Sequence, residues 1–113
     1  MKTQAFTLHT DRQGYYNITA AVKKCVSDAG VSSGLCVVFC PHTTAAITIN
    51  ENADPDVRHD LVLGMDGAFP IRSGFLHGEG NSDAHLKCMN VGASETILIE
   101  EGRLLLGTWQ AVY

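Results

Sequence analysis

The chain has 113 residues, of which 45% are hydrophobic, and its formal net charge at pH 7 is −4. A chain of this length and composition is typical of one globular domain and not of a disordered tail. The negative charge, and the absence of any basic cluster denser than Lys23-Lys24, argue against a nucleic-acid or anionic-membrane surface. No apolar run is long enough to cross a membrane, and MKTQAFTLHT lacks the apolar centre of a signal peptide, so we expect a cytoplasmic protein.

The first half of the chain predicts one helix and three strands. Residues 4–9, QAFTLH, alternate apolar and polar side chains, as a half-buried strand does. Residues 17–29 place apolar side chains at helical spacing, and Gly30 follows as a stop signal. GLCVVFC, residues 34–40, is apolar at successive positions, which predicts a central strand covered on both faces. TTAAITIN, residues 43–50, predicts another strand.

The second half predicts two helices and two strands. Asp54-Pro55 is an N-cap followed by proline at the first helical position, so a helix starts there. Ser82 is placed to cap a third helix that ends at Gly92, and residues 94–101 and 103–113 read as strands. The order β-α-β-β-α-α-β-β predicts a single α+β domain built around a mostly antiparallel, sandwich-like sheet. The buried stripe of the second helix is expected at Val57, Leu61, Gly64 and Met65, which turns Arg58, His59 and Asp60 outward.

Three histidines are the candidate metal ligands. His42 stands where the chain leaves a buried strand, and His77 and His85 flank HGEGNSDAH. If that loop folds back across the sheet edge, three imidazoles converge and leave an open coordination position, as in a catalytic zinc site. Imidazole suits zinc, nickel, copper and iron alike, and zinc is the divalent ion that we expect. The alternative is that these histidines only bond backbone in loops and caps.

The residues around these histidines suggest supporting roles. Asp83 and Glu79 are candidates to orient metal-bound imidazoles, and Glu79 is also a candidate general base on a metal-bound water. The glycines on either side of Glu79 allow a ligand to approach the backbone, and the helix that opens at Ser82 offers free N–H groups to an anion. His9 and His59 lie near a strand end and on a polar helix face, where we expect solvated roles.

Three long motifs together resemble the YjbQ-like family, whose members are described as secondary thiamine-phosphate synthases. The motifs are PHTTAAITINENADPDVRHDL, HGEGNSDAHLK and LLLGTWQAVY, and the resemblance extends over nearly the whole chain. The resemblance implies a homotrimeric α+β protein with a metal site at His42, His77 and His85. It also implies that Glu51, Asn81 and Asp83 line the pocket.

The activity implied by the resemblance is a metal-dependent one. It joins a pyrimidine diphosphate to a thiazole phosphate and releases pyrophosphate, so the partner is a small phosphorylated substrate. Catalytic roles are then expected for Glu51, Glu79, Asn81 and Asp83. Two alternatives stay open: a non-catalytic trimer that binds a small anion or metal, and a metal-dependent hydrolase. The family pattern continues past Tyr113 into a further strand, so residues 1–113 are expected to form one domain without that last strand.

Overall fold

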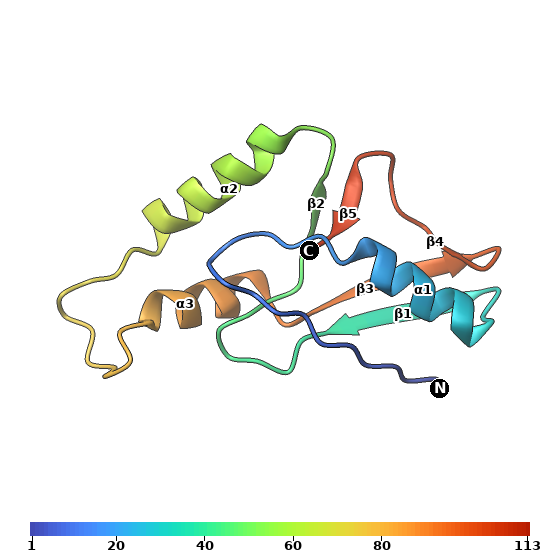
Figure 1. Ribbon diagram of the computed structural model, residues 1–113, viewed down its shortest axis with the longest axis horizontal. Helices are drawn as coiled ribbons and strands as arrows, with labels where there is room; N and C mark the ends of the chain where they lie inside the picture. The colour runs from blue at the N-terminus through green and yellow to red at the C-terminus, as the bar shows by residue number, and fades with distance from the viewer.

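The computed structural model describes residues 1–113. Its elements follow one another as α1 (Thr19–Ala29), β1 (Gly34–Phe39), β2 (Ile49–Glu51), α2 (Pro55–Ala68), α3 (Ser82–Val91), β3 (Ser94–Glu100), β4 (Arg103–Leu104) and β5 (Gln110–Val112) (Figure 1). The strands form a three-stranded sheet in the order β1-β3-β4 and a two-stranded sheet of β2 and β5, and every pairing is antiparallel. The predicted α+β class with antiparallel sheets is therefore confirmed.

Helix α1 packs on one face of the three-stranded sheet, and this contact makes the core. Val22 and Val26 lie one turn apart on the predicted apolar stripe and are buried. Gly30 ends the helix with a φ of 65°, a left-handed value that glycine adopts without strain, so the predicted stop is confirmed. The core cluster contains eight buried residues: Ile18, Val22, Val26, Ile47, Ile97, Ile99, Leu104 and Val112.

The strand predicted at residues 4–9 is not formed. This segment instead runs along α1, where the side chains of Lys2 and Gln4 donate to the carbonyls of Ala29 and Cys25. Alternation of apolar and polar residues is necessary for a half-buried strand, but a strand also needs a neighbour that pairs with its backbone. No strand of this chain pairs with the segment, and the prediction fails for that reason.

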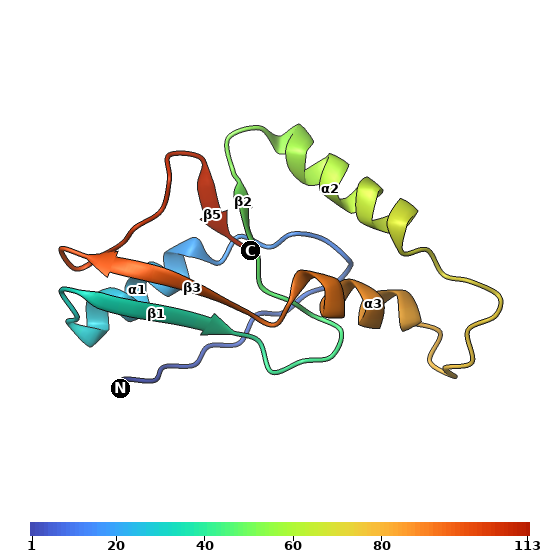
Figure 2. The same ribbon diagram turned by 180° about the vertical axis from the view of Figure 1, so that it is seen from behind.

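Strand β1 is covered on one face only, which corrects the prediction of a strand covered on both. Cys36 and Val38 point towards the core, whereas Leu35, Val37 and Phe39 are 64%, 63% and 62% exposed. Seen from behind, β1 and β3 lie in front of α1 and no helix covers them (Figure 2). We call this surface the outer sheet face and define it by Leu35, Val37, Phe39, Leu98 and Leu105, all of which are more than half exposed.

Helices α2 and α3 begin close to where the sequence predicts. The Asp54 carboxylate accepts a hydrogen bond from the Asp56 N–H at 2.9 Å, and Pro55 is the first helical residue, so this start is confirmed. Ser82 is the first residue of α3 and not its cap; Asn81 holds the cap position, without a side-chain cap bond. No residue of α2 is fully buried, and Gly64 of its predicted stripe is exposed, because no second layer of this chain covers the helix.

The chain is elongated. Its extents are 50 × 30 × 21 Å and its radius of gyration is 15.7 Å, whereas about 13 Å is typical of a compact domain of this length. Helix α2 projects away from the three-stranded sheet (Figure 1). Only 10 of the 113 residues are buried, so much of the apolar surface remains available for contact with other molecules.

Candidate functional site

His77 and His85 meet at the start of α3. The loop before the helix turns at Gly80, whose φ is 72° and whose N–H donates to the His77 carbonyl at 3.1 Å. This turn places the His77 ring beside the first turn of α3, where the two imidazole centroids lie 5.4 Å apart at 78°. The sequence suggested that three imidazoles converge when the loop folds back across the sheet edge, and the structure brings two of them, His77 and His85, together. We call this place the two-histidine corner.

Asn81 contributes an unpaired acceptor at the foot of α3. Its backbone carbonyl accepts from the Ala84 N–H at 3.0 Å, but its side-chain Oδ1 is buried and has no hydrogen-bond partner in the chain. A buried acceptor without a partner carries a desolvation cost of about 1–3 kcal/mol, so such atoms usually face a donor, a water or a cation. Asn81 is the one predicted site residue whose side chain has this property.

His42 is tied to α3 by its backbone and not by its ring. The Cys88 thiol lies 3.6 Å from the His42 carbonyl and 2.9 Å from the Ala45 carbonyl, so the loop after β1 rests on α3. Cys88 is about one turn from His85 along this helix. The His42 side chain is exposed, and nowhere in the chain do three His, Cys, Asp or Glu side chains gather closely enough to hold a metal ion. The donor set of a three-histidine site is therefore incomplete in this chain.

No hydrogen bond or ion pair joins the predicted carboxylates to the pair formed by His77 and His85. Asp83 Oδ2 lies 3.4 Å from Lys87 Nζ, which gives this half-buried carboxylate a cationic partner. Glu79 is exposed and takes part in no ion pair or side-chain hydrogen bond. Glu51 lies on β2, where its carbonyl accepts from the Tyr113 hydroxyl at 3.2 Å. Three of the four predicted catalytic residues, Glu79, Asn81 and Asp83, thus lie in the segment that carries the two-histidine corner, whereas Glu51 lies on β2.

A lysine that the sequence analysis did not single out joins three segments. Lys87 Nζ donates at 2.6 Å to both Gln13 Oε1 and Asp66 Oδ1, and its side chain is only 12% exposed. The hydrogen bonds from Lys87 and then from Gln13 hold the pKa of Asp66 below its usual value. Burial raises the pKa of Tyr15, and the charge of Lys87 opposes this rise. The spacing of Asp83 and Lys87, four residues apart on a helix, was the available signal.

The comparisons with known proteins agree with this fold. The profile of the family described as "UPF0047 protein YjbQ-like" matches residues 4–113. This chain belongs to the YjbQ-like UPF0047 family. UPF0047 protein YugU of Bacillus subtilis (strain 168) is 47% identical to it over 105 residues, which are 92% of this chain and 80% of YugU. UPF0047 protein YjbQ of Escherichia coli O157:H7 is 32% identical over 114 residues, covering 97% and 83% of the two chains.

Solved structures of YjbQ-like proteins share the fold. An uncharacterized conserved protein of the yjbq/upf0047 family from Clostridium acetobutylicum superposes with a TM-score of 0.90 at 53% identity, covering 94% of this chain and 83% of that one. A hypothetical protein from Aeropyrum pernix K1 gives a TM-score of 0.92 at 36% identity, with 99% and 85% covered.

The prediction that this protein is a metal-dependent enzyme is wrong. The names of these YjbQ-like relatives state no thiamine-phosphate synthesis and no metal-dependent catalysis. The chain also gathers no group of three metal-ligating side chains, because His42 approaches α3 only through its backbone.

None of the helices has the length and apolar character needed to cross a membrane.

Proposed function

We propose that this chain functions as one subunit of a homotrimer, with the outer sheet face as the contact between subunits. The exposure of that face carries the proposal. Leu35 and Leu98 are paired across β1 and β3, Leu105 lies beside them, and all three are more than half exposed. Burying apolar area stabilises association by about 25 cal/mol per Å², so a contiguous apolar sheet face favours contact with another protein surface.

A second copy of the chain is the partner that fits the homotrimer implied by the resemblance to the YjbQ-like family. The elongated shape supports it, since neighbouring subunits would supply the packing layers that α2 and the outer sheet face lack within one chain. The number three comes from the resemblance, whereas the exposed face supports self-association in general.

Light scattering tests the assembly. The wild-type protein should have about three times the mass of the chain, and Val37→Lys should lower this mass, because a lysine head group cannot be buried there without a partner. Leu76→Lys is the matched control, since Leu76 is 98% exposed on a loop outside this face. A monomeric wild-type protein contradicts the proposal, and a stable dimer contradicts the trimer alone.

We also propose that the two-histidine corner binds a divalent ion, zinc, and that His42 supplies the third ligand. The 5.4 Å between the His77 and His85 rings supports a shared ion. The His42 ring is exposed, and the carbonyl of the same residue contacts Cys88 on α3. Asn81, Asp83 and Glu79 would lie around this ion, and Glu51 would act from β2. No reaction is assigned to the ion.

Metal content measured on untagged protein tests this arrangement. His77→Ala, His85→Ala and His42→Ala should each lower the zinc content, while His59→Ala, at an exposed position on α2, should retain it. Loss of zinc in the first two variants but not in His42→Ala would contradict the third ligand. Full zinc content in the His85→Ala variant would contradict the site itself.

A small phosphorylated ligand and a cytoplasmic location complete the proposal, and no nucleic-acid partner is included because the chain carries a net charge of −4. The two-histidine corner contains no arginine or lysine that is free of a carboxylate partner, since Lys87 is paired with Asp66 and Asp83. The side chains of this corner therefore offer a phosphate no free cationic group of their own.

A further inference from the structure

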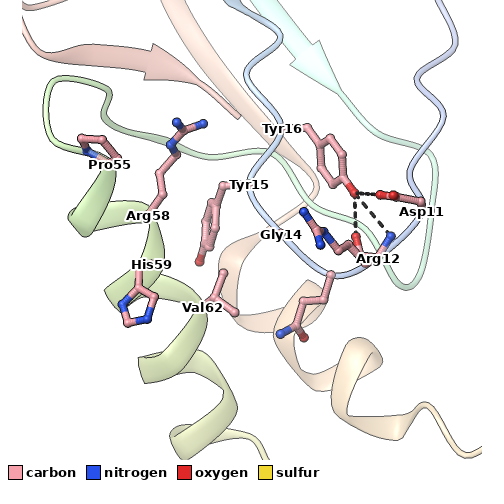
Figure 3. A pocket seen from close by; sticks show the side chains of 10 residues that line it. Asp11, Arg12, Gly14, Tyr15, Tyr16, Pro55, Arg58, His59 and Val62 are labelled. Atoms are coloured by element: carbon pink, nitrogen blue, oxygen red, sulfur yellow. Dashed lines mark hydrogen bonds between the residues drawn. The ribbon is translucent and has the colours of Figure 1, made fainter.

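A cavity of about 370 Å³ lies between residues 11–16 and the first two turns of α2. This volume is within the range of small-molecule sites, which is roughly 300–1,000 Å³. The side chains of Arg12 and Tyr15 reach it from the loop, and those of Arg58, His59 and Val62 reach it from α2 (Figure 3). Arg58 and His59, which the sequence turns outward towards solvent or a partner, both line this cavity.

Two guanidinium groups at the cavity have no carboxylate partner. None of the ion pairs of the chain involves Arg12 or Arg58. One carboxylate, that of Asp11, also lines the cavity, and it accepts a hydrogen bond from the Tyr16 hydroxyl at 2.9 Å. The Asp60 carboxylate lies 3.0 Å from Nδ1 of His59, so this histidine already has an anionic partner. The two unpaired arginines against the single lining carboxylate leave an excess of positive charge at the cavity.

The loop that carries Arg12 is held in place. The Tyr16 hydroxyl bonds to the carbonyl of Arg12 at 2.8 Å, which closes a turn of the loop on itself. Gln13 is fixed on both sides of its amide, since it donates to Asp66 at 2.8 Å and accepts from Lys87 at 2.6 Å. These bonds attach the loop to α2 and α3, so the arginine is presented from an ordered segment with part of its ordering cost already met.

Arg58 is held against an aromatic ring. Its guanidinium carbon lies 5.9 Å from the centroid of the Tyr113 ring, within the range of a cation–π contact. Tyr113 is buried and packs edge-on against Tyr15, with the ring centroids 6.1 Å apart. The half-buried Tyr15 ring faces Arg58, His59 and Val62 across the cavity (Figure 3). In Figure 3 the Tyr15 ring stands between Arg58, which comes from α2, and Arg12, which comes from the loop, so the cavity has a cation on each side of an aromatic wall.

We propose that this cavity binds a small phosphate monoester, with its phosphate between Arg12 and Arg58 and its organic part against Tyr15. A guanidinium presents a planar pair of N–H donors that matches two oxygens of a phosphate. A phosphate monoester has three terminal oxygens and up to two negative charges, so it can balance both guanidinium groups, whereas a carboxylate carries one negative charge. The inference rests on the proposed phosphorylated ligand and gives it a location, and it is independent of the trimer and of the metal ion.

Calorimetric titration with phenyl phosphate, at low ionic strength, tests the site. Phenyl phosphate should bind more tightly than inorganic phosphate, because its ring adds the contact with Tyr15. Arg12→Gln and Arg58→Gln should each weaken binding about tenfold or more, as expected for the loss of a charged hydrogen bond. Arg103→Gln is the matched control, because Arg103 is exposed on β4 and its neighbour is Glu101.

The outcomes distinguish failure of the proposed ligand from failure of the proposed site. If phenyl phosphate and inorganic phosphate both fail to bind the wild-type protein, the proposed phosphorylated ligand and this site are both overturned. If wild-type binding is unchanged in both the Arg12→Gln and Arg58→Gln variants, only the location is wrong. Benzoate that binds as tightly as phenyl phosphate would overturn the choice of phosphate. Arg58→Lys provides a check on folding, since it keeps the charge near Tyr113 while losing the planar pair of donors.

Discussion

Replacing Lys87 by methionine tests whether one buried cation joins α2, α3 and the loop at residues 11–16. Methionine keeps most of the apolar stem of the side chain and removes the charged group. The hydrogen bond to Gln13 is lost, which costs about 1 kcal/mol. Asp83 is only 18% exposed at its side chain, and leaving its carboxylate without a partner costs a further 1–2 kcal/mol or so.

Loss of the ion pair with Asp66 adds little to the cost of Lys87→Met. The Asp66 side chain is 52% exposed, so water replaces the lysine as its partner. Lys87→Met should therefore lower the free energy of unfolding by about 2–3 kcal/mol, a large part of the stability of a domain this size. Urea unfolding followed by circular dichroism measures the change. Protein concentrations must be matched, since association also contributes to stability.

Lys24→Met is the control for this experiment. Lys24 and its partner Asp28 are 75% and 50% exposed at their side chains, so removing this surface pair should leave the unfolding midpoint unchanged. A Lys87→Met variant within about 0.5 kcal/mol of the wild type, as an ordinary surface substitution would be, refutes the structural role of the lysine. Weaker binding of phenyl phosphate in this variant would further connect the lysine to the loop that carries Arg12.

Val112 is the most completely buried side chain, at 0% exposure, so Val112→Ala should cost about 2 kcal/mol of unfolding free energy in a denaturant titration; no loss would place Val112 outside the core. Gly102 has a φ of 75°, and Gly102→Ala should cost about 1 kcal/mol from left-handed strain, whereas a gain in thermal stability would contradict that backbone conformation. Burial raises the pKa of Tyr15, so its phenol should ionise above pH 10 in the folded state and stability should fall as the pH rises through that higher pKa. The difference between the ultraviolet titrations of the wild type and Tyr15→Phe checks this, and a pKa of Tyr15 that is not raised in the folded protein would contradict it.

Local signals in the sequence predicted most of the helices correctly. The start of α2 follows from Asp54-Pro55, and the end of α1 follows from Gly30, because caps and left-handed glycines act within one turn of the backbone. Alternation in residues 94–101 likewise predicted β3, where Ile97 and Ile99 are buried. The turn that brings His77 to His85 is equally local, since eight residues and one glycine with positive φ are enough to close it.

Contacts between distant segments were decided only by the tertiary structure. Residues 4–9 carry the pattern of a strand but have no strand to pair with, and β1 carries the pattern of a doubly covered strand but has a helix on one face only. His42 and His85 are far apart in the chain, and whether their rings meet depends on how the loop after β1 rests on α3. No local pattern contains that information.

The hydrogen bonds of Lys87 and the cavity lined by Arg12 and Arg58 also depend on contacts between distant segments. Gln13, Asp66 and Lys87 come from a loop and two helices, and Arg12 and Arg58 are brought together by the same packing. Each of these polar residues reads from sequence as an ordinary solvated side chain. Burial and partners are properties of the assembled fold, because they depend on which surfaces meet once the apolar stripe of α1 and the strands have formed the core. The sequence by itself thus determined the helices, the β3 strand and the family, and the packing of distant segments determined which charged groups became partners.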